Sequence, residues 1–241
     1  MPASGRPSPV VSEWGRQVSE KKVPRINILE NGPYRVFGAN LVRMKMSLSP
    51  AGRPVDWRQG PLLEEGTDYE LCRCGASSNK PYCDWSHVSA GFDGAETASR
   101  RPTLSRQKLY PLQGLTAADD KSLCIHAGFC VTEKTDFWEL AEHANNLSQR
   151  EELKRMIRNC PSGRLEYREG DSELPVEETL PREIGVIENG PLYVRGRIVV
   201  ESADGGTYEV RNRITLCRCG ASRNKPFCDG KHTDVGFRDG K

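Results

Sequence analysis

The sequence predicts an α+β protein in which two small, similar β-rich units flank an inserted α+β domain. A block of 17 residues occurs twice, as "LCRCGASSNKPYCDWSH" from Leu71 and as "LCRCGASRNKPFCDGKH" from Leu216. Between the copies lies a segment that resembles neither, with three further cysteines and a helical stretch. A repeat has to be recognised before a fold is assigned, because each copy is one structural unit.

The composition favours several small domains over one large one. Of the 241 residues, 36% are hydrophobic and 28% are charged, which is little apolar material for a single large core. Small domains bury a low fraction of their surface and often need additional stabilisation, such as a bound metal. The net charge of +2 predicts no nucleic-acid partner. No segment reads as a signal peptide or a membrane span, so a cytoplasmic protein without a membrane partner is expected.

The nine cysteines are the outstanding feature of the composition. In a reducing compartment, clustered thiols bind metals more often than they form disulfides. An odd number of cysteines also cannot pair completely. The sequence therefore predicts metal ligation.

The repeat begins well before the cysteines. "ILENGPYRVFGANLV" in the first copy matches "VIENGPLYVRGRIVV" in the second, and in each a turn precedes alternating residues typical of strands. The spacing from Glu30 to Cys72 is 42 residues, whereas that from Glu188 to Cys217 is 29. The extra residues are predicted to form a Pro/Gly-rich loop within "KMSLSPAGRPVDWRQG". The predicted parts are a disordered tail (1–24), the first unit (25–100), the inserted domain (107–170) and the second unit (183–241).

Each copy has the pattern Cys-x-Cys-x8-Cys-x3-His. Thiolates with one imidazole suit zinc or an iron–sulfur cluster. The single residue between the first two cysteines is a shorter spacing than in most zinc sites and counts mildly against zinc. A helix beginning near the third cysteine would place that cysteine and the histidine on one face, with Asp84 or Asp229 capping it. The predicted ligands are Cys72, Cys74, Cys83 and His87 in the first copy, and Cys217, Cys219, Cys228 and His232 in the second.

These segments resemble the CDGSH, or NEET, family of [2Fe–2S] proteins, whose pattern is C-x-C-x2-[ST]-x3-P-x-C-D-G-[SAT]-H. Two positions depart from it: Trp85 replaces the glycine in the first copy, and Lys231 replaces the small residue in the second. The resemblance implies one [2Fe–2S] cluster per copy, with the histidine as the labile ligand, and a fold completed by two interleaved copies. Because both copies lie on one chain, we expect an intramolecular NEET-like pseudo-dimer, and hence a monomer with an internal pseudo-two-fold axis.

The inserted segment carries its own set of ligands. Cys124, Cys130 and Cys160 have the spacing C-x5-C…C-P, which resembles a divergent single-cluster ferredoxin-like domain. The resemblance implies a [4Fe–4S] cluster, but no fourth cysteine remains for it. Either His126 supplies the fourth ligand or the site holds a [3Fe–4S] cluster, and His126 is equally well explained as a turn residue. Leu153 and its apolar neighbours have helical spacing within residues 137–160.

The predicted function is electron transfer by two [2Fe–2S] clusters and one [3Fe–4S] or [4Fe–4S] cluster, with a redox partner protein. Two alternatives are a cluster storage, transfer or repair factor that serves an apo-acceptor protein, and a zinc-binding interaction module. No nucleotide-binding loop or nucleophile elbow is present, so no enzymatic activity is expected. Basic residues near the ligands are predicted to form a solvated surface or to dock an acidic partner. They are Arg73, Lys80, Arg218, Arg223 and Lys225.

Overall fold

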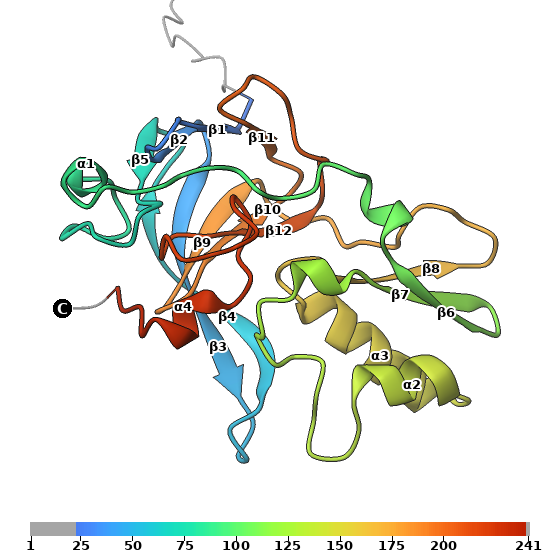
Figure 1. Ribbon diagram of the computed structural model, residues 1–241. Helices are drawn as coiled ribbons and strands as arrows, with labels where there is room; N and C mark the ends of the chain where they lie inside the picture. The colour runs from blue at the N-terminus through green and yellow to red at the C-terminus, as the bar shows by residue number, and fades with distance from the viewer. Residues whose placement is uncertain (1–22, 240–241) are drawn as a thin grey trace, which may run out of the picture.

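The computed structural model describes residues 23–239, so residues 1–22 of the predicted tail lie outside the described part (Figure 1). It confirms a mixed α+β protein. The first repeat contains β1 (Arg25–Ile28), β2 (Tyr34–Phe37), β3 (Asn40–Leu48), β4 (Pro54–Glu64), β5 (Tyr69–Leu71) and α1 (Ser86–Ser89). The second repeat contains β9 (Glu183–Ile187), β10 (Leu192–Arg195), β11 (Val199–Glu201), β12 (Arg213–Leu216) and α4 (Lys231–Asp234).

The two repeats exchange strands. One sheet has the order β11-β1-β2-β5, and the other has the order β12-β10-β9-β3-β4. In the first sheet β11 pairs in parallel with β1, with Val199 opposite Arg25. In the second sheet β3 pairs in parallel with β9, with Leu41 opposite Ile184. Each sheet therefore contains strands from both repeats.

The exchanged strands bury their side chains in one common core. Ile26 and Leu41 of the first repeat and Ile184 and Leu216 of the second are completely buried in the same apolar cluster. Full burial of such a side chain stabilises the fold by about 1.5–3 kcal/mol. Since both repeats supply these side chains, the core of either repeat is completed by the other.

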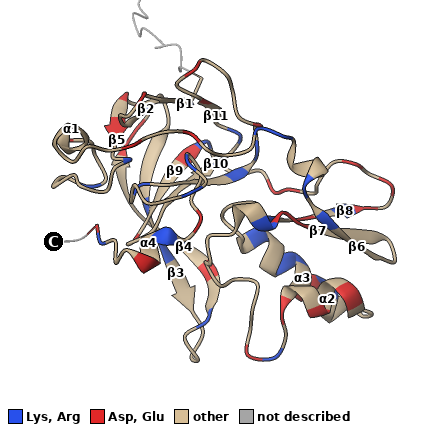
Figure 2. Ribbon diagram, in the orientation of Figure 1, with Lys and Arg blue, Asp and Glu red and all other residues tan. Residues whose placement is uncertain are grey.

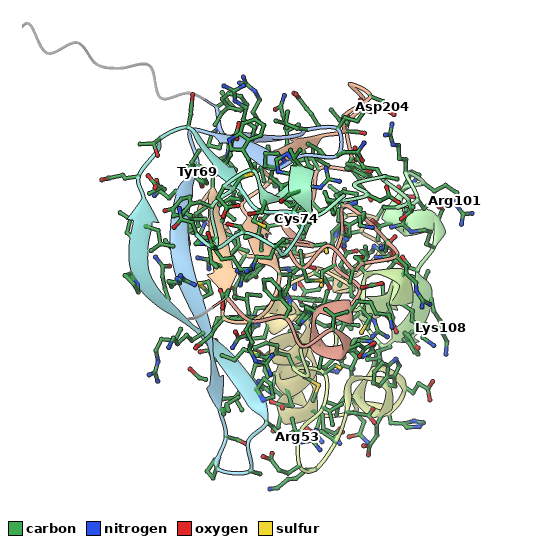
Figure 3. The ribbon with its side chains drawn as sticks, turned by 60° about the vertical axis from the view of Figure 1, so that its left-hand side comes forward. Arg53, Tyr69, Cys74, Arg101, Lys108 and Asp204 are labelled. Atoms are coloured by element: carbon green, nitrogen blue, oxygen red, sulfur yellow. The ribbon has the colours of Figure 1, made fainter. Side chains whose placement is uncertain are left out.

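The prediction of a Pro/Gly-rich loop in the first repeat is wrong, because β3 and β4 form a long antiparallel hairpin there. Pro50 and Gly52 lie in its turn, whereas Pro54 begins β4 and Gly60 lies within that strand. Trp57 of β4 packs its ring against Phe129, with 4.9 Å between centroids, and donates to the Asn159 carbonyl at 2.9 Å. In Figure 3 the hairpin, with Arg53 near its tip, runs down beside the helices of the inserted domain.

The inserted domain is a three-stranded sheet covered by two helices. Asn146 accepts a hydrogen bond from the Gln149 N–H at 3.0 Å and thereby caps the second helix. The helical stretch predicted over 137–160 is therefore two helices, and their apolar residues Phe137, Leu153 and Met156 are completely buried. The elements are η1 (Thr103–Ser105), β6 (Lys108–Leu112), β7 (Leu115–Asp119), η2 (Lys121–Leu123), α2 (Phe137–His143), α3 (Leu147–Asn159) and β8 (Leu165–Glu169).

The charged residues are spread over all three parts of the chain. Figure 2 shows Lys and Arg segments interspersed with Asp and Glu segments in both repeats and in the inserted domain. Within residues 23–239, no helix has the length and the apolar character needed to cross a membrane.

Candidate metal centres

In the first repeat, backbone hydrogen bonds bring the two ligand segments together. The Cys72 N–H donates to the Pro81 carbonyl at 2.9 Å, and the Cys83 N–H donates to the Glu70 carbonyl at 3.0 Å. These bonds place the Cys-x-Cys turn beside the segment that carries the third cysteine. Gly75 has a φ of +79°, a left-handed conformation that glycine adopts without steric cost.

The second repeat uses the same hydrogen-bond pattern. The Cys217 N–H donates to the Pro226 carbonyl at 2.8 Å, and the Cys228 N–H donates to the Thr215 carbonyl at 2.9 Å. Gly220 closes the turn with the same φ of +79°. The backbone thus positions the four predicted ligands of each repeat in the same way.

In each repeat the predicted ligands form two close pairs. Two ligands of a tetrahedral metal are about 3.7 Å apart when each metal–sulfur bond is about 2.3 Å. Each pair has a separation close to that value and can therefore hold one metal ion. The distances are 3.6 Å for Cys72–Cys74 and 3.7 Å for Cys217–Cys219 between Sγ atoms, and 3.5 Å for Cys83–His87 and 3.4 Å for Cys228–His232 between Sγ and Nδ1.

Two donor pairs suit a centre with two metal atoms. In a [2Fe–2S] cluster each iron takes two protein ligands, and histidine can replace cysteine on one of them. A zinc site would instead need all four ligands around one ion. Each repeat presents its four donors as two pairs. The residues present therefore fit a [2Fe–2S] cluster in each repeat.

The short helices begin after the third cysteine rather than at it, so the predicted placement of both ligands on the first turn is wrong. In the first repeat α1 begins at Ser86, and Asp84 accepts from the Ser86 N–H at 3.1 Å. The other oxygen of Asp84 accepts from the Ser78 N–H at 2.8 Å. Hydrogen bonds from Ser86 and then Ser78 hold the pKa of the Asp84 carboxyl well below its usual range. Asp84 therefore ties the helix to the ligand loop.

Burial keeps several of the cysteines protonated. It raises the pKa of the Cys83 and Cys228 thiols, and it raises the pKa of Cys130 to about 11. The hydrogen bond with Cys219 lowers the pKa of Cys217 to about 6, and the same bond raises the pKa of Cys219. Because metals bind thiolates, each protonated thiol has to release its proton as a metal binds.

Two of the basic residues expected at the surface are buried, so that prediction is wrong for them. Arg73 is 3% exposed and Arg218 is 1% exposed. Arg73 donates to the Gly94 carbonyl, and Arg218 donates to the Gly190 carbonyl at 2.6 Å. A guanidinium has five N–H donors in a planar fork, which lets it bind several carbonyls without leaving the interior. Each arginine thereby fixes the ligand turn of its repeat.

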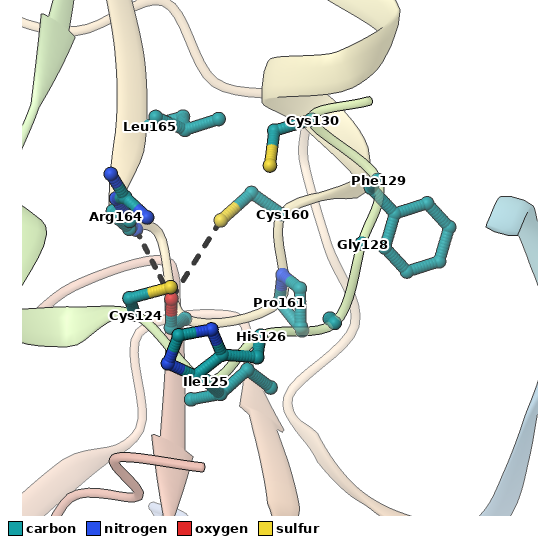
Figure 4. A pocket seen from close by; sticks show the side chains of 12 residues that line it. Cys124, Ile125, His126, Gly128, Phe129, Cys130, Cys160, Pro161, Arg164 and Leu165 are labelled. Carbon is teal, nitrogen blue, oxygen red and sulfur yellow. Dashed lines mark hydrogen bonds between the residues drawn. The ribbon is translucent and has the colours of Figure 1, made fainter. Parts of the chain in front are cut away.

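The three cysteines of the inserted domain line one pocket (Figure 4). Cys124 follows η2, Cys130 lies in the loop between η2 and α2, and Cys160 follows α3. In Figure 4 their sulfur atoms face the same space, with Arg164 at its edge. Three soft ligands around one pocket fit an iron–sulfur cluster with three thiolate ligands.

His126 lies at the border of this pocket and the second repeat. It lines the pocket, and its backbone has a φ of +58°. A Cβ added at Gly230 would lie 2.7 Å from His126 Cδ2, so the ring rests against the second repeat's ligand loop. Its role as the fourth iron ligand stays a prediction.

One contact between the repeats was missed from the sequence. Tyr34 is 1% exposed, and its hydroxyl donates to the Cys217 carbonyl at 2.8 Å and to the Pro226 carbonyl at 3.1 Å. The first repeat therefore supports the ligand turn of the second. A tyrosine after a turn gives no sign of this, because Leu192 occupies the same place in the second copy.

Comparisons with known protein families agree with this arrangement. Residues 31–88 and 189–233 match the family model described as "Iron-binding zinc finger CDGSH type". Residues 111–170 match the one described as "Divergent 4Fe-4S mono-cluster". No curated protein and no solved structure matches the chain.

Proposed function

The chain is an iron–sulfur protein whose two CDGSH segments flank a divergent 4Fe–4S domain, and we propose that it transfers electrons. In this proposal each repeat binds one [2Fe–2S] cluster through its three cysteines and its histidine. The pocket of Cys124, Cys130 and Cys160 binds a [3Fe–4S] or [4Fe–4S] cluster. Such clusters supply one-electron redox chemistry.

The pairing of the donors is the observation that supports this proposal most directly. Each repeat has two pairs of soft ligands with separations of 3.4–3.7 Å, as two irons bridged by sulfide require. The chain also places three ligand sets on one folded unit. A carrier of electrons gains from several neighbouring clusters, whereas a cluster donor needs only one labile site.

We further propose that the two repeats form an intramolecular NEET-like pseudo-dimer and that the protein is a monomer. The reciprocal parallel pairing of β11 with β1 and of β3 with β9 supports this proposal. The common apolar core of the two repeats supports it as well. Sedimentation or light scattering of the holo-protein tests the monomer directly.

The proposed role is that of a carrier without a reaction of its own, serving a redox partner protein in a reducing compartment such as the cytoplasm. All nine cysteines are free thiols, as ligation requires. Clusters in this chain would exchange electrons with the partner one at a time.

Metal analysis of protein purified without oxygen tests the proposal. Two [2Fe–2S] clusters with a three- or four-iron cluster give about seven to eight irons per chain. We expect matching sulfide, visible absorption and EPR signals that change reversibly on reduction with dithionite and on reoxidation. Stoichiometric zinc with negligible iron, or clusters that cannot be reduced reversibly, would contradict electron transfer.

Cluster transfer is the second candidate, and the exposure of the first site favours it. Cys83 is half-buried there, whereas its counterpart Cys228 is only 2% exposed. Trp85 beside it is 64% exposed. Incubation with an apo-ferredoxin distinguishes the two functions: transfer predicts loss of one [2Fe–2S] cluster to the acceptor, whereas electron transfer leaves the iron in place.

A further inference from the structure

The ligand turns of the two repeats touch each other. A Cβ added at Gly75 would lie 2.6 Å from the Cys219 carbonyl oxygen, and one added at Gly220 would lie 2.5 Å from the Cys74 carbonyl oxygen. Only glycine permits so close an approach of two backbones. The ligating cysteines of the two repeats are therefore in backbone contact.

The ligand loop of the second repeat also touches the inserted domain. The His126 ring occupies the space that a side chain at position 230 would need. On the same side, the Asn224 side chain donates to the Ser122 carbonyl at 3.1 Å. His126 is two residues from Cys124, and Gly230 is two residues from Cys228. Two residues span at most about 7 Å of chain, so the contact lies close to both ligand sets.

Two arginines of the second repeat hold the segment that carries the third cysteine of the pocket. The Arg213 guanidinium is buried and donates to the Cys160 carbonyl at 2.7 Å. Arg211 donates to the Gly163 carbonyl and to the Ser162 carbonyl, the latter at 3.4 Å. The inserted domain is therefore fixed to the second repeat on both sides of its pocket.

The first repeat keeps the asparagine, as Asn79, but has other residues at the remaining three positions. Trp85 stands where the second repeat has Gly230, and it is 64% exposed. Asp68 and Gly66, four and six residues before the first ligand, stand where the second repeat has Arg213 and Arg211. In Figure 1 α1 lies at the far left, the inserted domain lies on the right, and α4 lies between them.

We propose that the three sites form a single file in which the second repeat is the central one, with His126 and Gly230 as the crossing to the inserted domain. This inference rests on the proposed electron transfer. The spatial order is thus first repeat, second repeat, inserted domain, although the inserted domain comes second in the chain. Each step moves one electron: the donor site is oxidised by one unit, the acceptor site is reduced by one unit, and no bond to carbon, oxygen or hydrogen changes.

Magnetic coupling between reduced sites reads out this order without any activity assay. The holo-protein is reduced with dithionite, and its EPR spectrum is recorded. The EPR signal of each site is assigned from variants that lack one ligand: Cys83→Ser, Cys228→Ser and Cys130→Ser. We expect the second repeat's signal to be split or to relax faster when either of the other two sites is paramagnetic. The first repeat and the inserted domain should show the weakest mutual coupling.

Substitution at the crossing tests the named contact. Gly230→Trp places the first repeat's residue where His126 lies, so it should push the ring away and weaken the coupling between the inserted domain and the second repeat. Trp85→Gly is the matched control at the same position of the other repeat, and it should leave all couplings unchanged. Iron content is measured on both variants.

The outcomes separate the inference from the function on which it rests. Reversible reduction with equal or stronger coupling between the inserted domain and the first repeat would overturn the single file alone. Unchanged coupling in an iron-replete Gly230→Trp variant would overturn the crossing. If that variant loses iron, the wild-type couplings still decide the order. Absence of reversible reduction would instead reject electron transfer itself.

Discussion

Arg218 and Asp239 form an ion pair that is almost completely buried, with side chains 1% and 2% exposed and 2.6 Å between Nη2 and Oδ2. Arg218 lies between two predicted ligands, and Asp239 lies seven residues after His232. The Asp239 Oδ1 also accepts from the Asn189 N–H at 2.8 Å. The pair therefore anchors the last described residues of the chain to the ligand turn of the second repeat.

Asp239→Asn should destabilise the protein. The substitution leaves the Arg218 guanidinium buried without a counter-charge, and breaking a buried pair on one side costs about 3–5 kcal/mol. The free energy of unfolding in urea measures the effect. Asp234→Asn removes an exposed carboxylate from α4 and is the control, which should leave the free energy of unfolding nearly unchanged. Equal stability of the two variants would contradict a structural role for the buried pair.

The same pair should give the stability a pH dependence at the acid end. Burial alone would raise the pKa of Asp239, but Arg218, the Asn189 N–H and Arg43 together outweigh burial, so the folded-state pKa lies below the usual value of about 3.9. The stabilisation is then complete above about pH 4 and is lost as the pH falls through the lowered folded-state pKa. The stability difference between wild type and Asp239→Asn, measured at each pH, should shrink over that range. A difference that grows towards acid pH would contradict the assignment.

Gly75→Ala should disrupt both repeats, since the new Cβ meets the Cys219 backbone at 2.6 Å. We expect iron to be lost from both [2Fe–2S] sites together, as measured by iron content and EPR. Gly205→Ala is the control: Gly205 also has a positive φ, +83°, but nothing lies within 4 Å of its added Cβ. It should cost only the backbone strain of about 1–2 kcal/mol and retain the iron. Loss of one cluster alone in Gly75→Ala would show that the turns do not depend on each other.

His87→Cys should lower the reduction potential of the first site alone. Histidine in place of a thiolate removes negative charge from the cluster, and restoring the thiolate should shift the potential down by on the order of 100 mV. A potentiometric titration followed by EPR measures the shift. His232→Cys should do the same for the second site, and exposed His143→Ala should change neither. An unchanged potential in both cysteine variants would exclude the histidines as ligands.

Arg213→Met should weaken the attachment of the inserted domain to the second repeat and leave the clusters of the two repeats in place. Arg213 is 2% exposed, contacts the Cys160 carbonyl and pairs with Glu177 at 2.5 Å. We expect a loss of about 3–5 kcal/mol from the broken buried pair, with faster loss of iron from the three-cysteine pocket. Glu177→Met together with Arg213→Met should cost less than Arg213→Met alone, since no charge is then left unpaired. Simultaneous loss of all three clusters would contradict a local effect.

The close approach of the predicted ligand side chains within each repeat was accessible from the sequence because their spacing is a local property. The same holds for the helical spacing of Leu153 and Met156, whose burial follows from one helix face. The break before α3 was missed because an Asn cap is only one residue long and lies within an otherwise helical pattern.

The buried arginines were missed because their environment is made by distant segments. Arg73 and Arg218 occupy the interior since carbonyls of the preceding turns accept their N–H groups. The charge of these two side chains alone therefore predicted a position at the surface. The β3–β4 hairpin was missed for a related reason: the prolines and glycines indicated a loop, whereas pairing and the contact of Trp57 with Phe129 stabilise an extended conformation.

The exchange of β3 and β11 also has a consequence for synthesis on the ribosome. The first repeat emerges with β1 lacking the neighbour that Val199 and its strand will later provide. Until β9 and β11 have been translated, two strand edges stay open to wrong partners. Closing so long a segment of chain is slow, because its entropy has to be overcome before the contacts form. The nascent chain should therefore need protection, by a chaperone or by slow release, until its last third has left the exit tunnel.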